Sequence, residues 1–328
     1  MLTALVWLYG ISVLVLVILL HMVADRFWIA TLLMFSPRWI LCLPLALLVP
    51  AALLAHRRLL WPLLVTGLLL VGPLLGFDLP LRAFHGSGDG ELRVLTCNLR
   101  SSNEPFDALL SALPELRPDV VALQECPADH VPLPAGWNVI SEGSLLIASR
   151  YPIERSESRM ARHPPHKYPR VSALQATIHL PDQGRALRFC CVHLPSPRYG
   201  LDEVLDRRTL IAPKRRGTLV EETANRSAVS REVAGAVRVD SMDVLIAGDF
   251  NMPVESTIYR RDWSNYRNAF SDAGLGLGWT FRAELRRLSV GTRIDHVLMS
   301  RDWRARRAWI GPDVGSDHRP LIVDLVRP

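Results

Sequence analysis

Apolar runs after residue 90 end in side chains that bind cations, phosphates or protons. The run at residues 92–98 ends in Asn98, and the run at residues 120–125 ends in Glu125. Further along the chain, similar positions hold His193, Asp249, Asn251, Asp295, Asp317 and His318. Side chains at the ends of neighbouring strands converge on one crevice in open sheets and barrels. We therefore expect these residues to form a single site.

The residue types in this set restrict the chemistry that it supports. Carboxylate and amide oxygens with few nitrogens bind a hard cation such as Mg²⁺ or Mn²⁺ better than zinc. A carboxylate beside an imidazole orients the ring and favours its charged form, which suits contact with a phosphate. Metal-assisted attack of water on a phosphate ester uses both parts. The pattern thus predicts a phosphoesterase that uses Mg²⁺ or Mn²⁺.

Each part of the pattern also has a purely structural explanation. Asp249 and Asn251 suit an Asx turn after a strand, Glu125 suits a solvated strand end, and a single histidine such as His318 is usually structural. Together these explanations require five independent strands to end by chance in a residue of the right type. A shared functional site explains all of them at once, and we prefer it.

Four motifs then carry a resemblance to the endonuclease/exonuclease/phosphatase superfamily. In chain order they are Gln124-Glu125, Gly248-Asp-Phe-Asn251, Arg293-Ile-Asp295 and Ser316-Asp-His318. That superfamily includes DNase I-like and exonuclease III-like nucleases, neutral sphingomyelinases and inositol-polyphosphate 5-phosphatases. The resemblance covers residues 91–328 and is closest to bacterial members that are attached to a membrane. It implies a four-layer α/β/β/α sandwich of two packed mixed sheets flanked by helices.

The resemblance also implies a role for each residue of the site. Glu125 would be the main metal ligand, with Asn98 beside it contacting the metal or the phosphate, and Asp317 would complete the metal site. Asp249 would position or deprotonate the attacking water. The other residues would act on the phosphate: Asn251 and His193 by hydrogen bonds, and His318 by its charge, with Asp295 orienting the ring.

Two features depart from the pattern of the family's nucleases. These nucleases often carry an acidic or amide residue two positions after the residue equivalent to Asn98, where this chain has Arg100. We expect Arg100 to bind a substrate phosphate instead. The tyrosine that the nucleases place near the phosphate has two candidates here, Tyr168 and Tyr199. Arg170, close to Tyr168, is a further candidate for substrate binding.

Short strands and two helices are the elements that must position these residues. Apolar, β-rich runs predict strands at residues 92–98, 120–125, 144–149, 172–180, 187–193, 243–249, 293–299 and 321–325. One helix is predicted from Asn103 to about Leu116, and another over residues 226–239, which carry an apolar stripe. This mixture predicts two packed sheets flanked by helices.

The start of the chain has the composition of a membrane domain. Residues 1–84 contain five of the 38 Lys and Arg residues and two of the 32 Asp and Glu residues. Apolar runs at residues 2–23, 39–55 and 59–77 approach the length of about 20 residues that crosses a bilayer. A cleaved signal peptide needs a basic start and leaves the second and third runs unexplained. We therefore expect a multi-pass protein of the cell membrane, with the lipid bilayer as a partner.

A Gly-rich stretch at residues 85–90 separates this membrane domain, residues 1–84, from the phosphoesterase domain, residues 91–328. Three spans put the N-terminus and the Arg57–Arg58 pair on one side of the membrane and the large domain on the other. Basic residues are nearly balanced between the two sides, so the positive-inside rule selects no orientation.

The charges of the polar domain do not identify the substrate. The formal net charge of +6 is shared by both parts of the chain, and it marks no strongly nucleic-acid-binding surface. Basic stretches at residues 198–231 and 301–307 either contact a polyanion or form ordinary mixed-charge surface.

Three hypotheses follow: a nuclease, a phosphoesterase for a lipid headgroup or other small phosphate, and a non-catalytic membrane module. The intact set of acidic residues and His318 argues against the third. Nothing in the sequence indicates a protein partner.

The cysteines are expected to be small buried side chains. None of the five has the paired spacing of a zinc site. Adjacent Cys190 and Cys191 point to opposite faces of one strand. Disulfides and reactive thiols are the less favoured alternative.

Overall fold

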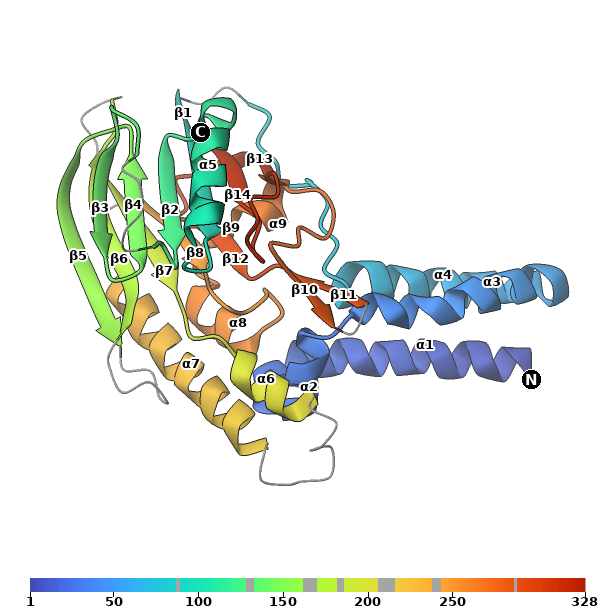
Figure 1. Ribbon diagram of the computed structural model, residues 1–328. Coiled ribbons are helices and arrows are strands. Elements are labelled where there is room, and N and C mark those ends of the chain that lie inside the picture. Colours follow the sequence, from blue (N-terminus) through green and yellow to red (C-terminus); the bar gives the residue numbers. More distant parts are fainter. Residues whose placement is uncertain are drawn as a thin grey trace.

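Two six-stranded sheets lie face to face in the computed structural model (Figure 1). The structure describes residues 1–86, 89–127, 133–161, 170–181, 186–205, 216–237, 243–285 and 288–327. The first sheet has the order β13 (Arg304–Ile310), β14 (Leu321–Arg327), β1 (Asp89–Asn98), β2 (Val120–Gln124), β4 (Leu145–Ser149) and β3 (Asn138–Glu142). The second has the order β5 (Ile153–Ala161), β6 (Arg170–His179), β7 (Ala186–His193), β8 (Asp243–Asp249), β12 (Asp295–Met299) and β9 (Arg267–Asn268). A further pair of strands, β10 (Phe281–Leu285) and β11 (Leu288–Thr292), forms a small sheet of its own.

Apolar side chains of both sheets form the central core. Val94 of the first sheet and Phe189 and Leu245 of the second belong to this core, and all three are buried. β1 is parallel to β2, and β7 is parallel to β8, whereas the other pairs are antiparallel. Both sheets are therefore mixed, and their central strands are apolar on both faces because both faces are covered.

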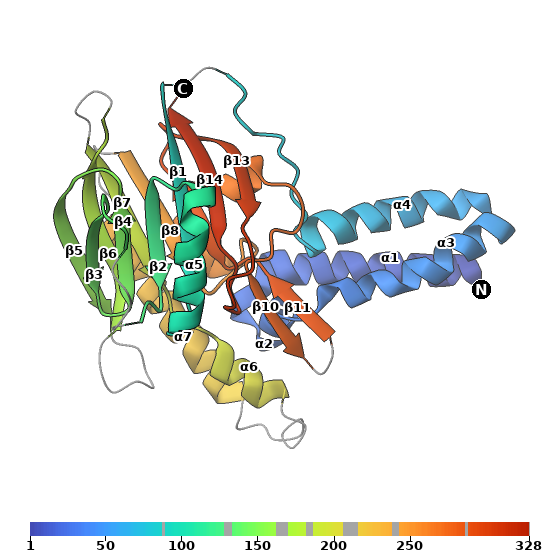
Figure 2. The same cartoon turned by 45° about the horizontal axis from the view of Figure 1, so that its top comes forward.

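Helices cover the outer face of each sheet, as Figure 2 shows from a second direction. The helices of the sandwich are α5 (Asn103–Leu116), α6 (Arg198–Leu205), α7 (Arg216–Val237), α8 (Thr257–Trp263) and α9 (Ala269–Ala273). α5 packs on the first sheet through Phe106 and Leu109. α7 and α8 pack on the second sheet through side chains that include Val233 and Trp263. The predicted four-layer α/β/β/α sandwich is confirmed.

The strands that the apolar pattern does not predict lie at the edges of the sheets. β13 and β3 are the edges of the first sheet, and β5 and β9 are the edges of the second. Edge strands carry charged and polar residues that interrupt the apolar pattern, as Arg304, Arg306 and Arg307 do in β13. The basic stretch at residues 301–307 is therefore largely part of an edge strand. The helix predicted to begin at residue 226 begins at Arg216 instead, because its first turns lack an apolar stripe.

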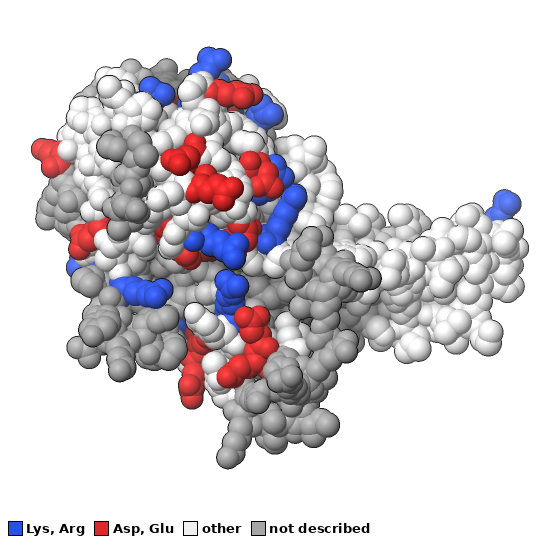
Figure 3. All heavy atoms as spheres, viewed as in Figure 1, with Lys and Arg blue, Asp and Glu red and all other residues white. Residues whose placement is uncertain are grey.

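Three apolar helices precede the sandwich and project from it in one direction (Figure 1). They span Leu2–Arg26, Arg38–Ala55 and Arg57–Leu74, and each is long and apolar enough to cross a membrane. Their regular parts are α1 (Leu2–Ile18), α3 (Leu43–Ala55) and α4 (Leu60–Leu69), which are extended by 3₁₀- and π-helical turns, and the short helix α2 (Trp28–Met34) follows the first span. On the face that Figure 3 shows, the projecting part carries charge only as a basic side chain at its far tip.

Buried ion pairs join these helices to the sandwich. Arg38 Nη1 lies 3.0 Å from Glu255 Oε1, and the two side chains are 7% and 5% exposed. Arg226 Nη2 of α7 lies 3.2 Å from Asp25 Oδ1, and these side chains are 0% and 3% exposed. Asp25 also accepts a hydrogen bond from Ser256 Oγ at 2.6 Å. The helices and the sandwich are therefore packed together directly.

The chain between the last apolar helix and β1 also packs on the sandwich. Asp78 exchanges backbone hydrogen bonds of 3.0 Å with Gly276, and the N–H of Phe84 donates to Ala305 O at 2.8 Å. Within the Gly-rich stretch predicted at residues 85–90, β1 already begins at Asp89, and residues 87–88 lie outside the described residues. Arg306 Nη2 of β13 also donates to Gly86 O at 2.9 Å, so the connection is held to the sandwich up to Gly86.

Candidate active site

The strand ends bring the predicted site residues to one edge of the sandwich. β1 and β2 are parallel, so Asn98 and Glu125 leave the first sheet at the same edge. In the second sheet His193 of β7 and Asp295 of β12 both lie opposite Asp249 of β8. Carboxyl ends of parallel strands and the amino end of an antiparallel neighbour meet at one edge of a sheet. The site therefore draws on both sheets.

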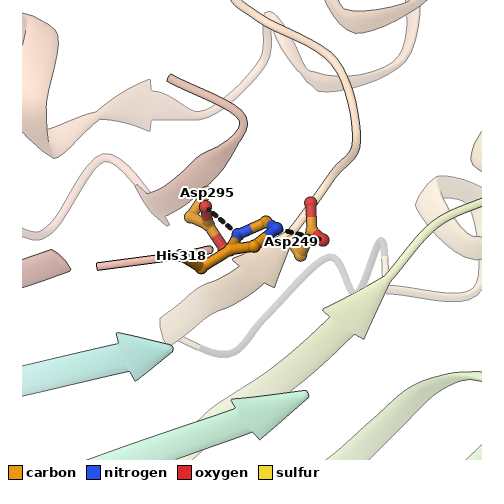
Figure 4. A group of neighbouring side chains, drawn as sticks. All are labelled: Asp249, Asp295 and His318. Carbon is orange, nitrogen blue, oxygen red and sulfur yellow. Dashed lines mark hydrogen bonds and ion pairs between the residues drawn. The ribbon is translucent and has the colours of Figure 1, made fainter. Parts of the chain in front are cut away.

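Asp249, His318 and Asp295 form a buried row (Figure 4). His318 Nδ1 lies 2.8 Å from Asp295 Oδ2, and His318 Nε2 lies 3.8 Å from Asp249 Oδ2. The exposed fractions are 1% for Asp249, 0% for Asp295 and 5% for His318. The hydrogen bond to Asp295 fixes the orientation of the ring and turns its Nε2 edge toward Asp249.

The two carboxylates change the proton affinity of the ring. Burial lowers the pKa of His318, but the charges of Asp295 and Asp249 outweigh burial and raise this pKa to about 10. The pKa of Asp249 rises to about 7, first because the carboxyl is buried and then because Asp295 lies near, although the charge of His318 opposes the rise. Near neutral pH the ring is therefore charged, while Asp249 is able to exchange a proton. A fixed cation and a poised base suit phosphate chemistry.

Asn98 links the two sheets through its side-chain amide. Its Nδ2 donates to Glu125 Oε1 at 3.2 Å and to Asp249 Oδ2 at 3.0 Å. Its Oδ1 accepts the backbone N–H of Arg100 at 2.9 Å. Asn98 therefore holds two carboxylates in place and faces them with its amide hydrogens.

His193 lies against the same two carboxylates. Its Nε2 is 3.7 Å from Glu125 Oε1 and 3.8 Å from Asp249 Oδ2. Burial lowers the pKa of His193, and the opposing effect of Glu125 does not restore it. The two histidines of the site thus differ in charge near neutral pH, since His193 is neutral where His318 is protonated.

Several residues at the site have backbone φ angles in the unfavourable left-handed region. Among the described residues other than glycine, positive φ angles occur at Ala24, Arg100, Ser101, Arg117, Glu125 and Asn251. Asparagine tolerates this left-handed region, but Glu125 at φ 48° is strained. Backbone bonds hold Glu125 on both sides, from Ser101 N–H to its carbonyl at 2.8 Å and from Cys126 N–H to Ser144 O at 2.9 Å. The fold therefore fixes the direction of this carboxylate.

The Gly248-Asp-Phe-Asn251 turn fixes Asp249. Asn251 donates its backbone N–H to Asp249 Oδ1 at 2.8 Å, and its Nδ2 to Asp249 Oδ2 at 3.2 Å and to Leu194 O at 2.8 Å. A Cβ on Gly248 would lie 2.0 Å from Val192 O of β7, so only glycine fits there. The Asx turn considered from the sequence is present, and it holds a residue of the site.

Glu125 and Asp317 are the carboxylates that fit a hard cation best. Their side chains are 36% and 24% exposed and line the same cleft. The buried row of Asp249, Asp295 and His318 also lies within 4.8 Å, close enough for one ion. However, Asp295 already accepts from His318 Nδ1, and a ring with a raised pKa keeps the protons that a metal would displace. Partly exposed carboxylates match Mg²⁺ or Mn²⁺, which keep several bound waters.

Except for the fully buried Asp295, the side chains of the site line one cleft of about 1120 Å³. The predicted substrate-binding residues Arg100 and Arg170 line it, and Arg100 Nε lies 4.0 Å from Asp317 Oδ2. Tyr199 also lines the cleft and is 59% exposed. The other tyrosine candidate, Tyr168, lies outside the described residues.

A family comparison agrees with this geometry. The model of the Endonuclease/Exonuclease/phosphatase family matches residues 95–318, from within β1 to the histidine of the buried row. This chain belongs to that family. No curated protein matches the chain by sequence.

Solved structures share the fold of this endonuclease/exonuclease/phosphatase protein. An endonuclease/exonuclease/phosphatase from Beutenbergia cavernae matches with a TM-score of 0.51 and 19% identity, over 72% of each chain. The human Nocturnin catalytic domain with bound sulfate has a TM-score of 0.52 and 15% identity, over 73% of this chain and 95% of that one. The 3′ phosphatase NExo from Neisseria, bound to a product DNA hairpin, has a TM-score of 0.51 and 16% identity, over 71% and 98%. At these identities the likeness establishes the fold.

The candidate site also contains residues that had no predicted role. Thr280 Oγ1 accepts the backbone N–H of Asp295 at 3.1 Å. Ser316 Oγ accepts the backbone N–H of His318 at 3.1 Å, and the ring of Phe281 packs edge-on against the imidazole, with 5.1 Å between centroids. Ser316 belongs to a quoted motif, but no sequence signal marks Thr280 or Phe281, since they reach the site from β10 and the segment before it.

The five cysteines are free, as expected. Cys97, Cys126, Cys190 and Cys191 are buried, and burial raises the pKa of Cys126 and of Cys191 to about 12. Neutral buried thiols are inert, so these residues act as small core side chains.

Proposed function

We propose that this protein is a divalent-metal-dependent hydrolase of phosphodiesters, held in the cell membrane by three spanning helices. The observation that carries the proposal is the buried row of Asp249, His318 and Asp295, which opens into the cleft that Glu125 lines. A proton acceptor, a fixed cation and a partly exposed carboxylate meet there. Hydrolysis of a phosphate ester requires these three parts.

Asp249 takes a proton from the attacking water. A pKa of about 7 makes this carboxyl a stronger base than an ordinary aspartate and still leaves it substantially ionised at neutral pH. Asn98 and Asn251 hold its oxygens by hydrogen bonds of 2.8 to 3.2 Å. These contacts aim the carboxylate before substrate arrives, and they support a positioning role for Asn251 beside its expected contact with phosphate.

His318 stabilises the charge that develops on the phosphate oxygens. Its Nε2 edge faces the cleft side of Asp249, and Asp295 keeps the ring charged and oriented. His193, neutral and next to Glu125, supplies a further hydrogen-bond donor. Because the donors are fixed before the reaction, little reorganisation is needed in the transition state. No side chain of the row acts as a nucleophile, so transfer is directly to water.

Glu125 and Asp317 would hold the cation, with Asn98 keeping Glu125 in place. A divalent ion bound there would neutralise charge on the substrate's phosphate. The contacts of Asn98 are those of a positioning residue, and its direct contact with metal or phosphate stays a prediction.

The three apolar helices make the protein a multi-pass membrane protein in this proposal. Large apolar side chains on them are exposed, for example 77% at Leu47 and 90% at Leu54, as expected for contact with lipid. The sandwich sits at one end of these helices (Figure 1), so the cleft stays next to the bilayer.

The proposal is tested with the full-length protein in detergent and the substrate bis-p-nitrophenyl phosphate. Hydrolysis with Mg²⁺ or Mn²⁺ is expected, and Asp249→Asn or His318→Ala should lower kcat by about 100-fold or more. Glu125→Gln should raise the metal concentration needed for half-maximal rate. Glu142→Gln, on the cleft wall but outside the row, is the matched control and should keep the wild-type rate. Wild-type turnover in all three site variants would refute the assignment.

A further inference from the structure

One part of the active-site cleft comes from the apolar N-terminal segment. Phe35, which directly follows α2, lines the same cleft as Asp249 and His318. The apolar helix Arg38–Ala55 begins three residues later. The cleft therefore extends from the phosphate-binding end to the base of a helix that is apolar enough to cross a membrane.

Apolar side chains of α6 and of the β10–β11 pair also line the cleft. They include Leu201 and Leu205, one turn apart on α6, and Val290 of β11. α6 is fixed against α7 at Gly200, where a Cβ would lie 2.5 Å from Leu219 Cα. Figures 1 and 2 both show α6 and β10–β11 at the end of the sandwich from which the helices project. The apolar walls thus open toward the membrane side of the molecule.

The β10–β11 pair is also coupled to the catalytic row. Phe281 of β10 contacts the ring of His318, and the backbone N–H of Arg282 donates to Asp317 O at 2.8 Å. The same short sheet therefore borders the phosphate end through Phe281 and the apolar end through Val290. A substrate bound along this sheet would therefore have its phosphate near Phe281 and its apolar part near Val290.

The size of the cleft indicates more than a small phosphate. Its volume of about 1120 Å³ exceeds the roughly 300–1,000 Å³ typical of pockets for drug-sized ligands. A phosphate with a small polar headgroup fills only part of this space. Apolar side chains such as Phe35, Leu201 and Leu205 are among those that line the cleft and are available to the rest of a larger substrate.

Among the described residues, the charged side chains that line the cleft are of both signs. Arg198 lies 3.9 Å from Asp202 on the same helix, and Glu142 and Glu222 line the cleft together with Arg100, Arg170 and Arg282. Channels for single-stranded nucleic acid carry basic groups along their length, with aromatic side chains for the bases. This cleft has its phosphate chemistry at one end and apolar side chains at the other, which is the polarity of a membrane lipid.

We propose that the substrate is a phospholipid of the surrounding bilayer. Its phosphodiester lies at Asp249 and His318, and its acyl chains run between α6 and β10–β11, past Phe35, toward the hydrocarbon. Water forms a new bond to phosphorus and gives its proton to Asp249, and one ester P–O bond breaks. The leaving alkoxide takes a proton from water in the cleft, and Asp249 returns its proton to solvent. The inference rests on the proposed function and names its substrate class.

Alkyl phosphates of increasing chain length test the apolar part of the cleft. Ethyl, butyl and octyl phosphate are compared as inhibitors of bis-p-nitrophenyl phosphate hydrolysis by the full-length protein, each below its micelle concentration. Burial of added methylene groups should tighten inhibition by about tenfold or more from ethyl to octyl phosphate. Equal inhibition by all three would overturn the lipid inference and leave the proposed hydrolase intact. Absence of hydrolysis altogether would overturn both.

A matched pair of variants locates the chain-binding surface. Leu205 on α6 and Val139 on β3 are each 41% exposed, so an aspartate at either position costs little in folding. Leu205→Asp should abolish the dependence of inhibition on chain length. Val139→Asp, outside the cleft lining, should leave both this dependence and the rate on bis-p-nitrophenyl phosphate unchanged. The same response from both variants would contradict the proposed groove.

Vesicles of phosphatidylethanolamine and phosphatidylglycerol provide the substrate itself. The full-length protein reconstituted in them should release diacylglycerol or phosphatidic acid, measured by mass spectrometry, and Leu205→Asp should lower this rate by about tenfold or more. Plasmid DNA and RNA are incubated in parallel. Cleavage of either nucleic acid without turnover of the lipids would overturn the inference.

Discussion

The Nε2 atoms of His193 and His318 both lie 3.8 Å from Asp249 Oδ2, yet the two rings carry different charges near neutral pH. Burial lowers the pKa of both rings. At His318 the charges of Asp295, which accepts the Nδ1 hydrogen at 2.8 Å, and of Asp249 outweigh burial and raise the pKa, whereas at His193 the charge of Glu125 does not outweigh burial. One ring therefore supplies a charge and the other a neutral donor.

The pH dependence of hydrolysis follows from these shifts. Asp249 must lose its proton, so kcat/KM should rise as pH passes about 7, and His318 must keep its proton, so kcat/KM should fall as pH passes about 10. Asp295→Asn removes the charge that raises the pKa of His318 and leaves the burial that lowers it. The alkaline limb should then move to lower pH. A pH–rate profile checks this, and an unmoved alkaline limb would count against the role of Asp295.

The residue types of the site were predictable, but some of their orientations were not. Asn98, Glu125 and Asp249 could be predicted because each follows an apolar strand. The sequence does not show that Asn98 turns its amide hydrogens toward both carboxylates, because this depends on the Arg100 N–H that binds its oxygen. Thr280 gave no signal at all, since it acts through a backbone N–H.

Among the elements, buried strands were predictable and edge strands were not. β8 matches its predicted bounds of Asp243–Asp249 because both of its faces are apolar and covered. β13 was missed because it is half exposed and carries three arginines. Helix α5 was predictable at both ends, whereas the first turns of α7 lack an apolar stripe. Apolar periodicity indicates which side chains are buried, so it does not predict an element whose side chains are partly exposed to solvent.

Replacing each of two glycines by alanine should change the free energy of unfolding in opposite directions. Gly248 in β8 approaches Val192 O too closely for a Cβ, so Gly248→Ala should lower the free energy of unfolding by more than about 1 kcal/mol. Gly235 in α7 has open space around it, and Gly235→Ala should raise the free energy of unfolding by up to about 1 kcal/mol. Denaturant unfolding of the two variants measures both effects. Equal stability of the two would contradict the close approach of β7 and β8.

At the scale of the whole molecule, the apolar helices are part of the packed structure. The sequence predicted the spans and the sandwich as separate parts joined by a Gly-rich stretch. It did not predict the pairs Arg38–Glu255 and Asp25–Arg226, because their partners are about 200 residues apart and no local pattern connects them. These pairs hold the cleft at a fixed position relative to the helices.

The buried pair predicts a strong effect on stability. Arg38→Met leaves the carboxylate of Glu255 buried without its partner, and it should destabilise the protein by about 3–5 kcal/mol. Arg82→Met removes a guanidinium that is 78% exposed and 3.9 Å from Asp272, so it should change stability by less than about 1 kcal/mol. Thermal unfolding of the detergent-solubilised variants compares them. Similar midpoints for both would show that Arg38 does not anchor the helices.

The central claim is that a divalent cation and Asp249 together drive phosphodiester hydrolysis. Its most direct test is turnover of bis-p-nitrophenyl phosphate by the full-length protein after metal removal with EDTA, followed by titration with Mg²⁺ or Mn²⁺. We expect the rate to be lost with EDTA and to return on titration in the wild type, but not in Asp249→Asn. Turnover that persists without metal, or that returns in Asp249→Asn, would contradict it.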